Sequence, residues 1–152
     1  MNNFKSPISK ALSEIEGVSE IEEKTLSDEI NEDNTSLMTL FKFHDVNCSA
    51  LVAQTGEDNS CGINLRAVIS IEISEKKSKE HILNDLNKFN HSKLGIKVVL
   101  LNVKDTEIKV SFDVETWTFI DLISVKTTEL NLNYLFFSMS LLVTEHSYMD
   151  AL

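Results

Sequence analysis

The stretch INLRAVISIEI at residues 63–73 begins the series of patterns that decides the fold of this chain. Every odd-numbered position in it is apolar, and Val68 is the only apolar residue at an even position. Successive side chains of a strand point to opposite faces, so this alternation is typical of a strand that buries one face. Residues 63–73 are therefore predicted to form a half-buried strand.

A helix and two further strands are expected after this strand. Residues 78–90 carry one apolar stripe at helical spacing, which predicts an amphipathic helix. Residues 96–103 are nearly all apolar, and residues 107–115 alternate between apolar and polar. The short polar connection between these two runs predicts a hairpin.

The remaining elements complete an α+β pattern. Residues 37–43 and 48–54 are two short strand candidates, and a long apolar helix is expected from about residue 119 to residue 146. We predict an antiparallel sheet of about five strands with helices packed on it, in the order α-β-β-β-α-β-β-α. The single α+β domain would span residues 37–147, followed by a tail at residues 148–152.

The N-terminal residues 1–36 are expected to form an acidic helix and connector. Residues 1–34 hold nine acidic side chains and three lysines. Ile8, Leu12 and Ile15 fall at helical spacing behind Ser6 and Pro7, a favourable helix start. We expect a short docked helix followed by a mobile acidic segment, and disorder of the whole stretch is the alternative.

The overall charge limits the classes of partner. The chain has 152 residues and a formal net charge of −10, with 24 acidic and 14 basic residues. Binding to phosphate groups relies on Lys and Arg side chains, so nucleic acid and anionic membranes are disfavoured. A basic protein partner is allowed, although solubility alone also favours such a charge.

The two cysteines and the first residues indicate a cytoplasmic protein. Cys48 and Cys61 are too few for a disulfide framework. The first residues, MNNFKSP, contain no apolar segment of the kind found in a secretory signal.

No motif along the chain predicts catalysis, a cofactor or a metal. His44 and Cys48 are the closest pair of metal-ligand types, and two ligands do not make a zinc site. Asp113 and Glu115 share one strand face, as paired carboxylates of a hydrolase do, but alternation alone places polar residues there. Residues 56–60 lack the spacing of a calcium loop. We expect a protein that is not an enzyme and has no evident small-molecule substrate.

The long C-terminal helix carries two opposed apolar stripes when its residues are projected at about 100° per residue. It is too short and too interrupted to span a bilayer. The first stripe contains Leu130, Tyr134, Phe137 and Leu141. The second stripe contains Leu132, Phe136, Met139 and Val143.

A helix packed on a single sheet needs only one apolar stripe, so the second stripe requires its own cover. The candidates are the helix around Leu12, a second copy of the chain, or another protein. We predict a partner or homodimer interface on the second stripe. Trp117 is interpreted either as an added surface anchor of this interface or as an aromatic residue at the edge of the core.

One stretch of the chain resembles a known family. Residues 82–90, ILNDLNKFN, look like a helix that ends in an N-x-x-N-type motif, and the hairpin at 98–114 and the final apolar helix follow in the same order. Residues 37–143 thus resemble the YbjN family of bacterial sensory-transduction regulators, whose fold is like that of type III secretion chaperones. The acidic N-terminal stretch departs from the start of that family.

The resemblance implies a small, acidic, non-enzymatic cytoplasmic protein that binds other proteins, also as a dimer. The leading hypothesis is a chaperone-like or regulatory protein-binding module. The alternative is an immunity or antitoxin-type inhibitor whose acidic surface covers a basic toxin.

Overall fold

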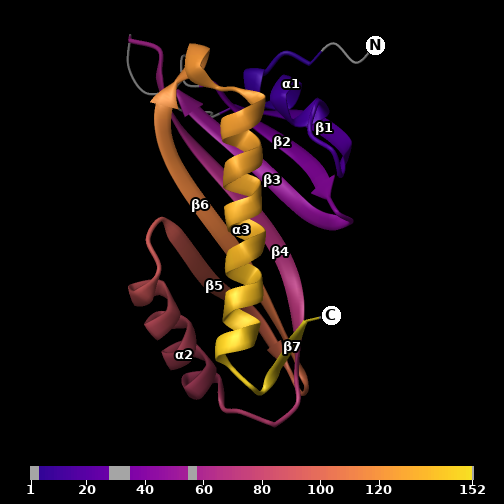
Figure 1. Ribbon diagram of the computed structural model, residues 1–152, viewed down its shortest axis with the longest axis vertical. Helices are drawn as coiled ribbons and strands as arrows, with labels where there is room; N and C mark the ends of the chain where they lie inside the picture. Colours follow the sequence, from indigo (N-terminus) through magenta and orange to yellow (C-terminus); the bar gives the residue numbers. More distant parts are fainter. Residues whose placement is uncertain (1–3, 28–34, 55–57, 152) are drawn as a thin grey trace.

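The computed structural model describes residues 4–27, 35–54 and 58–151. Figure 1 shows their arrangement. The elements in chain order are α1 (Pro7–Ser13), β1 (Val18–Ser27), β2 (Thr35–Phe43), β3 (Val46–Gln54), β4 (Ser60–Ile73), α2 (Lys79–Ser92), β5 (Ile96–Lys104), β6 (Glu107–Phe119), the 3-10 helix η1 (Ile120–Leu122), α3 (Val125–Glu145) and β7 (Met149–Ala151). The predicted α+β class is confirmed.

The strands form one antiparallel sheet in the order β1-β2-β3-β4-β6-β5. The short β7 also pairs with β4, at Ile71, Glu72 and Ile73, beyond the residues that pair with β3. The long α3 lies along one face of the sheet, with α1 beside its first half and α2 beside its second half (Figure 1). In the described part of the chain the opposite face of the sheet carries no helix.

The core lies between the helices and one face of the sheet, and it is continuous from α1 to α2. The predicted alternation in residues 63–73 is confirmed, since five of its six odd-numbered apolar residues are buried and Ile69 is half-buried. Phe112 of β6 and Leu132, Leu135 and Leu142 of α3 are completely buried. Each such side chain contributes about 1.5–3 kcal/mol by leaving water.

The N-terminal prediction was wrong after the first helix. That helix ends at Ser13, and residues 18–27 form β1, which pairs with β2 across a bulge between Ser19 and Glu22. The Glu23 carboxylate accepts hydrogen bonds from the backbone N–H groups of Lys5 and Ser6, which ties β1 to the start of α1. Residues 18–27 are therefore a sixth strand of the sheet and not a mobile segment. Residues 28–34 lie outside the described residues.

Two C-terminal boundaries also differ from the prediction. Strand β6 continues to Phe119, and α3 begins only at Val125, where the Ser124 side chain accepts the Thr127 N–H in a capping box. The residues expected as a tail include β7, and Tyr148 and Met149 are buried. β-branched and aromatic residues at 116–119 favour the longer strand.

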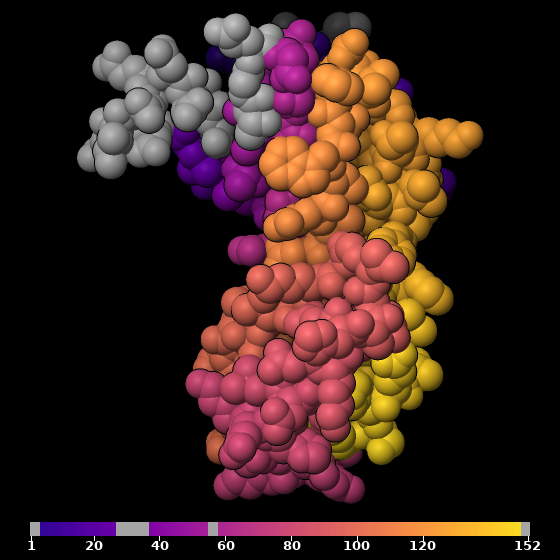
Figure 2. Space-filling view, turned by 90° about the vertical axis from the view of Figure 1, so that its left-hand side faces the viewer, coloured from indigo at the N-terminus to yellow at the C-terminus, as the bar shows by residue number. Residues whose placement is uncertain are grey.

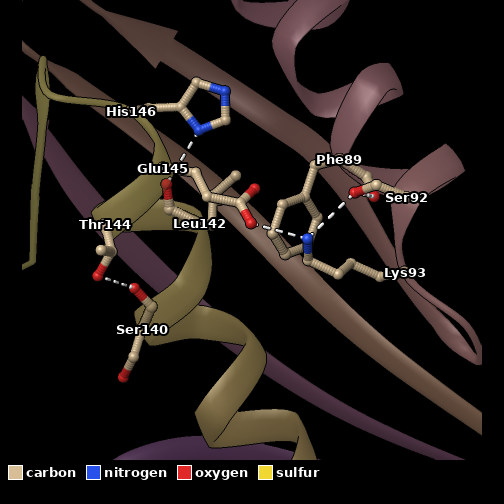
Figure 3. Close-up of polar contacts among 8 residues, drawn as sticks. All are labelled: Phe89, Ser92, Lys93, Ser140, Leu142, Thr144, Glu145 and His146. Carbon is tan, nitrogen blue, oxygen red and sulfur yellow. Dashed lines mark hydrogen bonds and ion pairs between the residues drawn. The ribbon is translucent and has the colours of Figure 1, made fainter.

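Polar contacts join the end of α2 to the end of α3 (Figure 3). Lys93 Nζ lies 2.7 Å from Glu145 Oε1 and 3.1 Å from Ser92 Oγ, above the Phe89 ring. The Tyr148 hydroxyl donates to Asp85 Oδ2 over 2.7 Å. These contacts join α2 to the end of α3 and to the segment that leads into β7.

Candidate partner-binding site

The second stripe of α3 faces the chain itself. Leu132 is completely buried, and the Phe136 ring packs edge-on against Phe43 with centroids 4.8 Å apart. Met139 and Val143 are half-buried. The predicted interface is therefore wrong for Leu132, because the chain itself buries that position and leaves it no surface for a partner.

The exposed apolar residues of α3 belong to the first stripe instead. Leu130 and Phe137 are 68% and 59% exposed, whereas Tyr134 and Leu141 are half-buried. The Tyr134 hydroxyl donates to the carbonyl of Leu94, the most exposed apolar residue described. A helical projection finds two opposed stripes, but only the packing shows which one meets the sheet.

Trp117 lies on the face of the sheet without helices and is 74% exposed. Its indole covers Gly62, the residue opposite it on β4, where a Cβ atom would approach the ring to 3.3 Å. A Cβ atom at position 62 would require the indole to shift by a few tenths of an ångström. Trp117 is thus a surface aromatic residue and not part of the edge of the core.

The last part of β6 has a strand on one side only. β4 pairs with β6 along its whole length, as far as Phe119, but β5 pairs with it only as far as Val114. Among the described residues, no strand pairs with the other side of residues 115–119. This stretch, together with the side chains around it, is called the β6 edge site below. Figure 2 views it from the side, with the orange end of β6 above the salmon segment that leads into β5.

Two hydrogen bonds show which backbone groups of β6 point outward. The Ile73 N–H donates to the Thr106 carbonyl over 2.8 Å, and the Ile120 N–H donates to the Asn59 carbonyl over 2.9 Å. The backbone N–H and C=O groups of even-numbered β6 residues therefore point toward β4 at both ends of the ladder. The β4–β6 pairing has no register shift, so the same holds along the whole of β6. Peptide groups alternate along a strand, so those of Glu115, Trp117 and Phe119 point away from β4.

Two hollows lie near the β6 edge site, one on the helix side of the sheet and one on the other face, where it lies over β3 and β4 beside Trp117. The hollow on the helix side has a volume of about 250 Å³ and is bordered by Thr116, Thr118, Leu122 and Leu130. The hollow on the other face has a volume of about 170 Å³, and its lining includes Leu51, Gly62, Glu115 and Trp117. Leu122, in η1, is 60% exposed. The edge therefore has apolar surface on both sides.

Acidic side chains outnumber basic ones around this site. Asp58, Glu115, Asp121 and Glu129 lie on the lining elements or next to them. The nearby bases are Lys97, Lys126 and Arg66, and Arg66 is paired with Asp113. The side-chain and backbone hydrogen bonds from Ser60 lower the pKa of Asp58, so this carboxylate is ionised at neutral pH. The local charge favours a basic ligand.

Neither the two cysteines nor the pair Asp113 and Glu115 has the surroundings of a catalytic group. Burial raises the pKa of Cys48 to about 12 and also raises that of Cys61, so neither thiol ionises readily. Asp113 is buried and holds Arg66 Nε at 2.6 Å, while Glu115 is exposed, so the two carboxylates have different surroundings.

Residues 4–27, 35–54 and 58–151 contain neither a metal-binding group nor a membrane-spanning helix. No group of three His, Cys, Asp or Glu side chains there could hold a metal ion. No helix in the same ranges has both the length and the apolar character needed to cross a membrane. The predicted loop at residues 56–60 lies partly outside the described residues.

Sequence reasoning identified Trp117 but missed the edge beside it. The signal was present in Thr116, Thr118 and Phe119, whose strand propensity extends β6 past the end of β5. Leu122 and Leu130 could not be recognised, because an apolar residue in a pattern does not show whether another element covers it.

The fold and this site define an α+β protein with an uncovered apolar edge. Comparison with protein-family models, with curated proteins and with solved structures found no match to this chain.

Proposed function

We propose that this chain is a non-enzymatic protein-binding module, chaperone-like or regulatory, that acts in the cytoplasm. The observation that carries the proposal is the cluster of exposed Trp117, Leu122 and Leu130 around the β6 edge site. Apolar and aromatic groups held open to water on a rigid sheet and helix are typical of protein interfaces. A YbjN-like role is part of the same hypothesis, and the bound molecule is either a protein partner or a second copy of the chain.

A second candidate is an inhibitor of a basic toxin, of the immunity or antitoxin type. It is supported by the net charge of −10 and by the four carboxylates near the β6 edge site. An acidic surface speeds association with a basic partner and selects it over acidic ones. One stoichiometric basic partner would favour this candidate, whereas several unfolded clients would favour a chaperone.

The test is affinity capture from native extract with the full chain and two variants. The double variant Leu122→Ser, Leu130→Ser removes two exposed leucines of the site. Leu83→Ser is the matched control, because Leu83 is an exposed leucine on α2, away from the site. We expect the double variant to lose its partners, with binding at least tenfold weaker, and the control to keep them.

Light scattering after size-exclusion chromatography measures self-association in the same three proteins. A partner retained equally by both variants, or no partner at all, would contradict the proposal. A dimer that only the double variant loses would identify the second copy as the occupant of the surface.

A further inference from the structure

We propose that the β6 edge site binds an extended, basic segment of a partner protein as an added strand. This inference rests on the proposed function and names the form and charge of the partner segment. Exposed strand edges are ready templates for another chain, and strand addition is a common mode of peptide recognition.

The backbone of residues 115–119 is arranged for such pairing. The N–H and C=O groups of Glu115, Trp117 and Phe119 point to the open side, as the bonds at Thr106 and Ile120 require. An added strand would continue the line of β5, whose pairing with β6 stops where Ile96 faces Val114. It would therefore extend an existing row of the sheet, and no described strand would have to move.

The side chains on the two faces favour a segment with apolar residues at alternate positions. Neighbouring residues of an added strand point to opposite faces. One set would enter the hollow of about 250 Å³ beside Leu122 and Leu130. The other set would lie on the helix-free face of the sheet, beside Trp117 and Glu115, which are both exposed there.

The charge around the site selects a basic segment over a second copy of this chain. Asp58, Glu115, Asp121 and Glu129 lie on or next to the lining elements, the nearby Arg66 is already paired with Asp113, and the whole chain carries a net charge of −10. A second copy would bring the same acidic surface to the interface, which like-charge repulsion opposes. Lysine or arginine residues that flank the apolar positions would instead meet opposite charge.

The first test uses synthetic peptides and the full chain. The probe is the acetylated and amidated peptide Lys-Val-Lys-Leu-Lys-Val-Lys, and its control has Glu in place of every Lys. We expect the basic peptide to slow hydrogen exchange at the amides of Trp117 and Phe119, and the acidic peptide to bind roughly tenfold or more weakly. Equal binding of both peptides, unprotected amides, or no binding of the basic peptide at millimolar concentration would each overturn the proposal.

The second test separates backbone pairing from side-chain contact in binding of the basic peptide. Trp117→Pro and Trp117→Thr both remove the indole, but only proline removes the outward N–H group. Proline is tolerated at this edge because the lost N–H does not bond to β4. We expect the proline variant to bind the peptide roughly tenfold more weakly than the threonine variant, with similar unfolding curves.

Equal peptide binding by the two variants would refute strand addition. The proposed function would still stand if the double variant Leu122→Ser, Leu130→Ser lost its captured partners. Loss of a dimer in the proline variant alone would show that a second copy is the occupant, and this too would overturn the basic-peptide proposal.

Discussion

At the scale of the residue, single neighbours fix the position of the exposed Trp117 ring and of the buried Asp113 carboxylate. Gly62 leaves room for the Trp117 indole to lie against β4, and this contact holds an exposed aromatic ring in a defined place. Arg66 lies beside the buried Asp113 carboxylate, whose other oxygen accepts the Ser111 hydroxyl. A buried carboxylate requires such partners, since an unpaired charge away from water is costly. The arginine and the serine therefore stabilise a charged group on the helix-free face.

The buried thiol of Cys48 makes stability depend on pH in the alkaline range. Burial raises its pKa from 9.0 to about 12, so the unfolded chain releases this proton at a lower pH than the folded chain. The contribution of the protonated Cys48 thiol to the free energy of unfolding is complete below pH 9 and is lost as the pH rises toward 12. Between pH 8 and pH 10 we expect the wild type to lose about 1 kcal/mol more stability than Cys48→Val.

Denaturant unfolding at the two pH values measures this difference. Tyr148, whose pKa burial also raises, is present in both proteins and cancels in the comparison. Parallel loss of stability in the two proteins would show that Cys48 does not make this contribution.

At the scale of the element, strand length and helix capping position the β6 edge site. β6 has 13 residues and β5 has 9, so the end of β6 extends past its neighbour. The 3-10 helix η1 then turns the chain, and Ser124 starts α3 so that Leu130 stands beside that end. The site therefore depends on where α3 begins.

Replacement of Ser124 by alanine should weaken the start of α3. The Ser124 hydroxyl accepts the Thr127 N–H, and its loss leaves a helix-terminal donor without this cap. We expect the free energy of unfolding to fall by about 1 kcal/mol. Ser140→Ala is the control, because Ser140 is an exposed residue inside the same helix. Denaturant unfolding of both variants checks the expectation, and an equal effect would argue against capping.

At the scale of the whole molecule, the C-terminal residues hold the far end of the sheet and helices together. β7 pairs with β4, and Tyr148 and Met149 are buried against the core. The Tyr148 hydroxyl reaches Asp85 of α2, and Lys93 reaches Glu145 of α3. This end is closed by its own chain, whereas at the β6 edge site the exposed Trp117, Leu122 and Leu130 border one hollow.

A chain that ends at residue 146 should be markedly less stable than the full chain. It loses two buried side chains, each of which contributes about 1.5–3 kcal/mol. We therefore expect a loss of at least about 3 kcal/mol. Tyr148→Phe, which removes only the hydroxyl bond to Asp85, should cost about 1 kcal/mol. Thermal and denaturant unfolding measure both, and a truncated chain as stable as the wild type would contradict the structural role of β7.

Local periodicity in the sequence determined much of the fold. The alternation in residues 63–73 and 107–115 predicted the two central strands, and the single apolar stripe in residues 78–90 predicted α2. These signals are readable because each depends on residues a few positions apart. The α+β class followed from their order.

Only the tertiary structure decided what covers each face and edge. The acidic residues 18–27 become a strand because β2 offers them a partner, and α3 turns Leu132 inward and Leu130 outward because the sheet lies on one side of it. The open edge of residues 115–119 exists because β5 begins only at Ile96, opposite Val114, and no residue of β5 pairs with β6 beyond that point. Such pairing joins residues that are far apart in the chain. The pattern of one segment therefore does not predict which other segment lies against it.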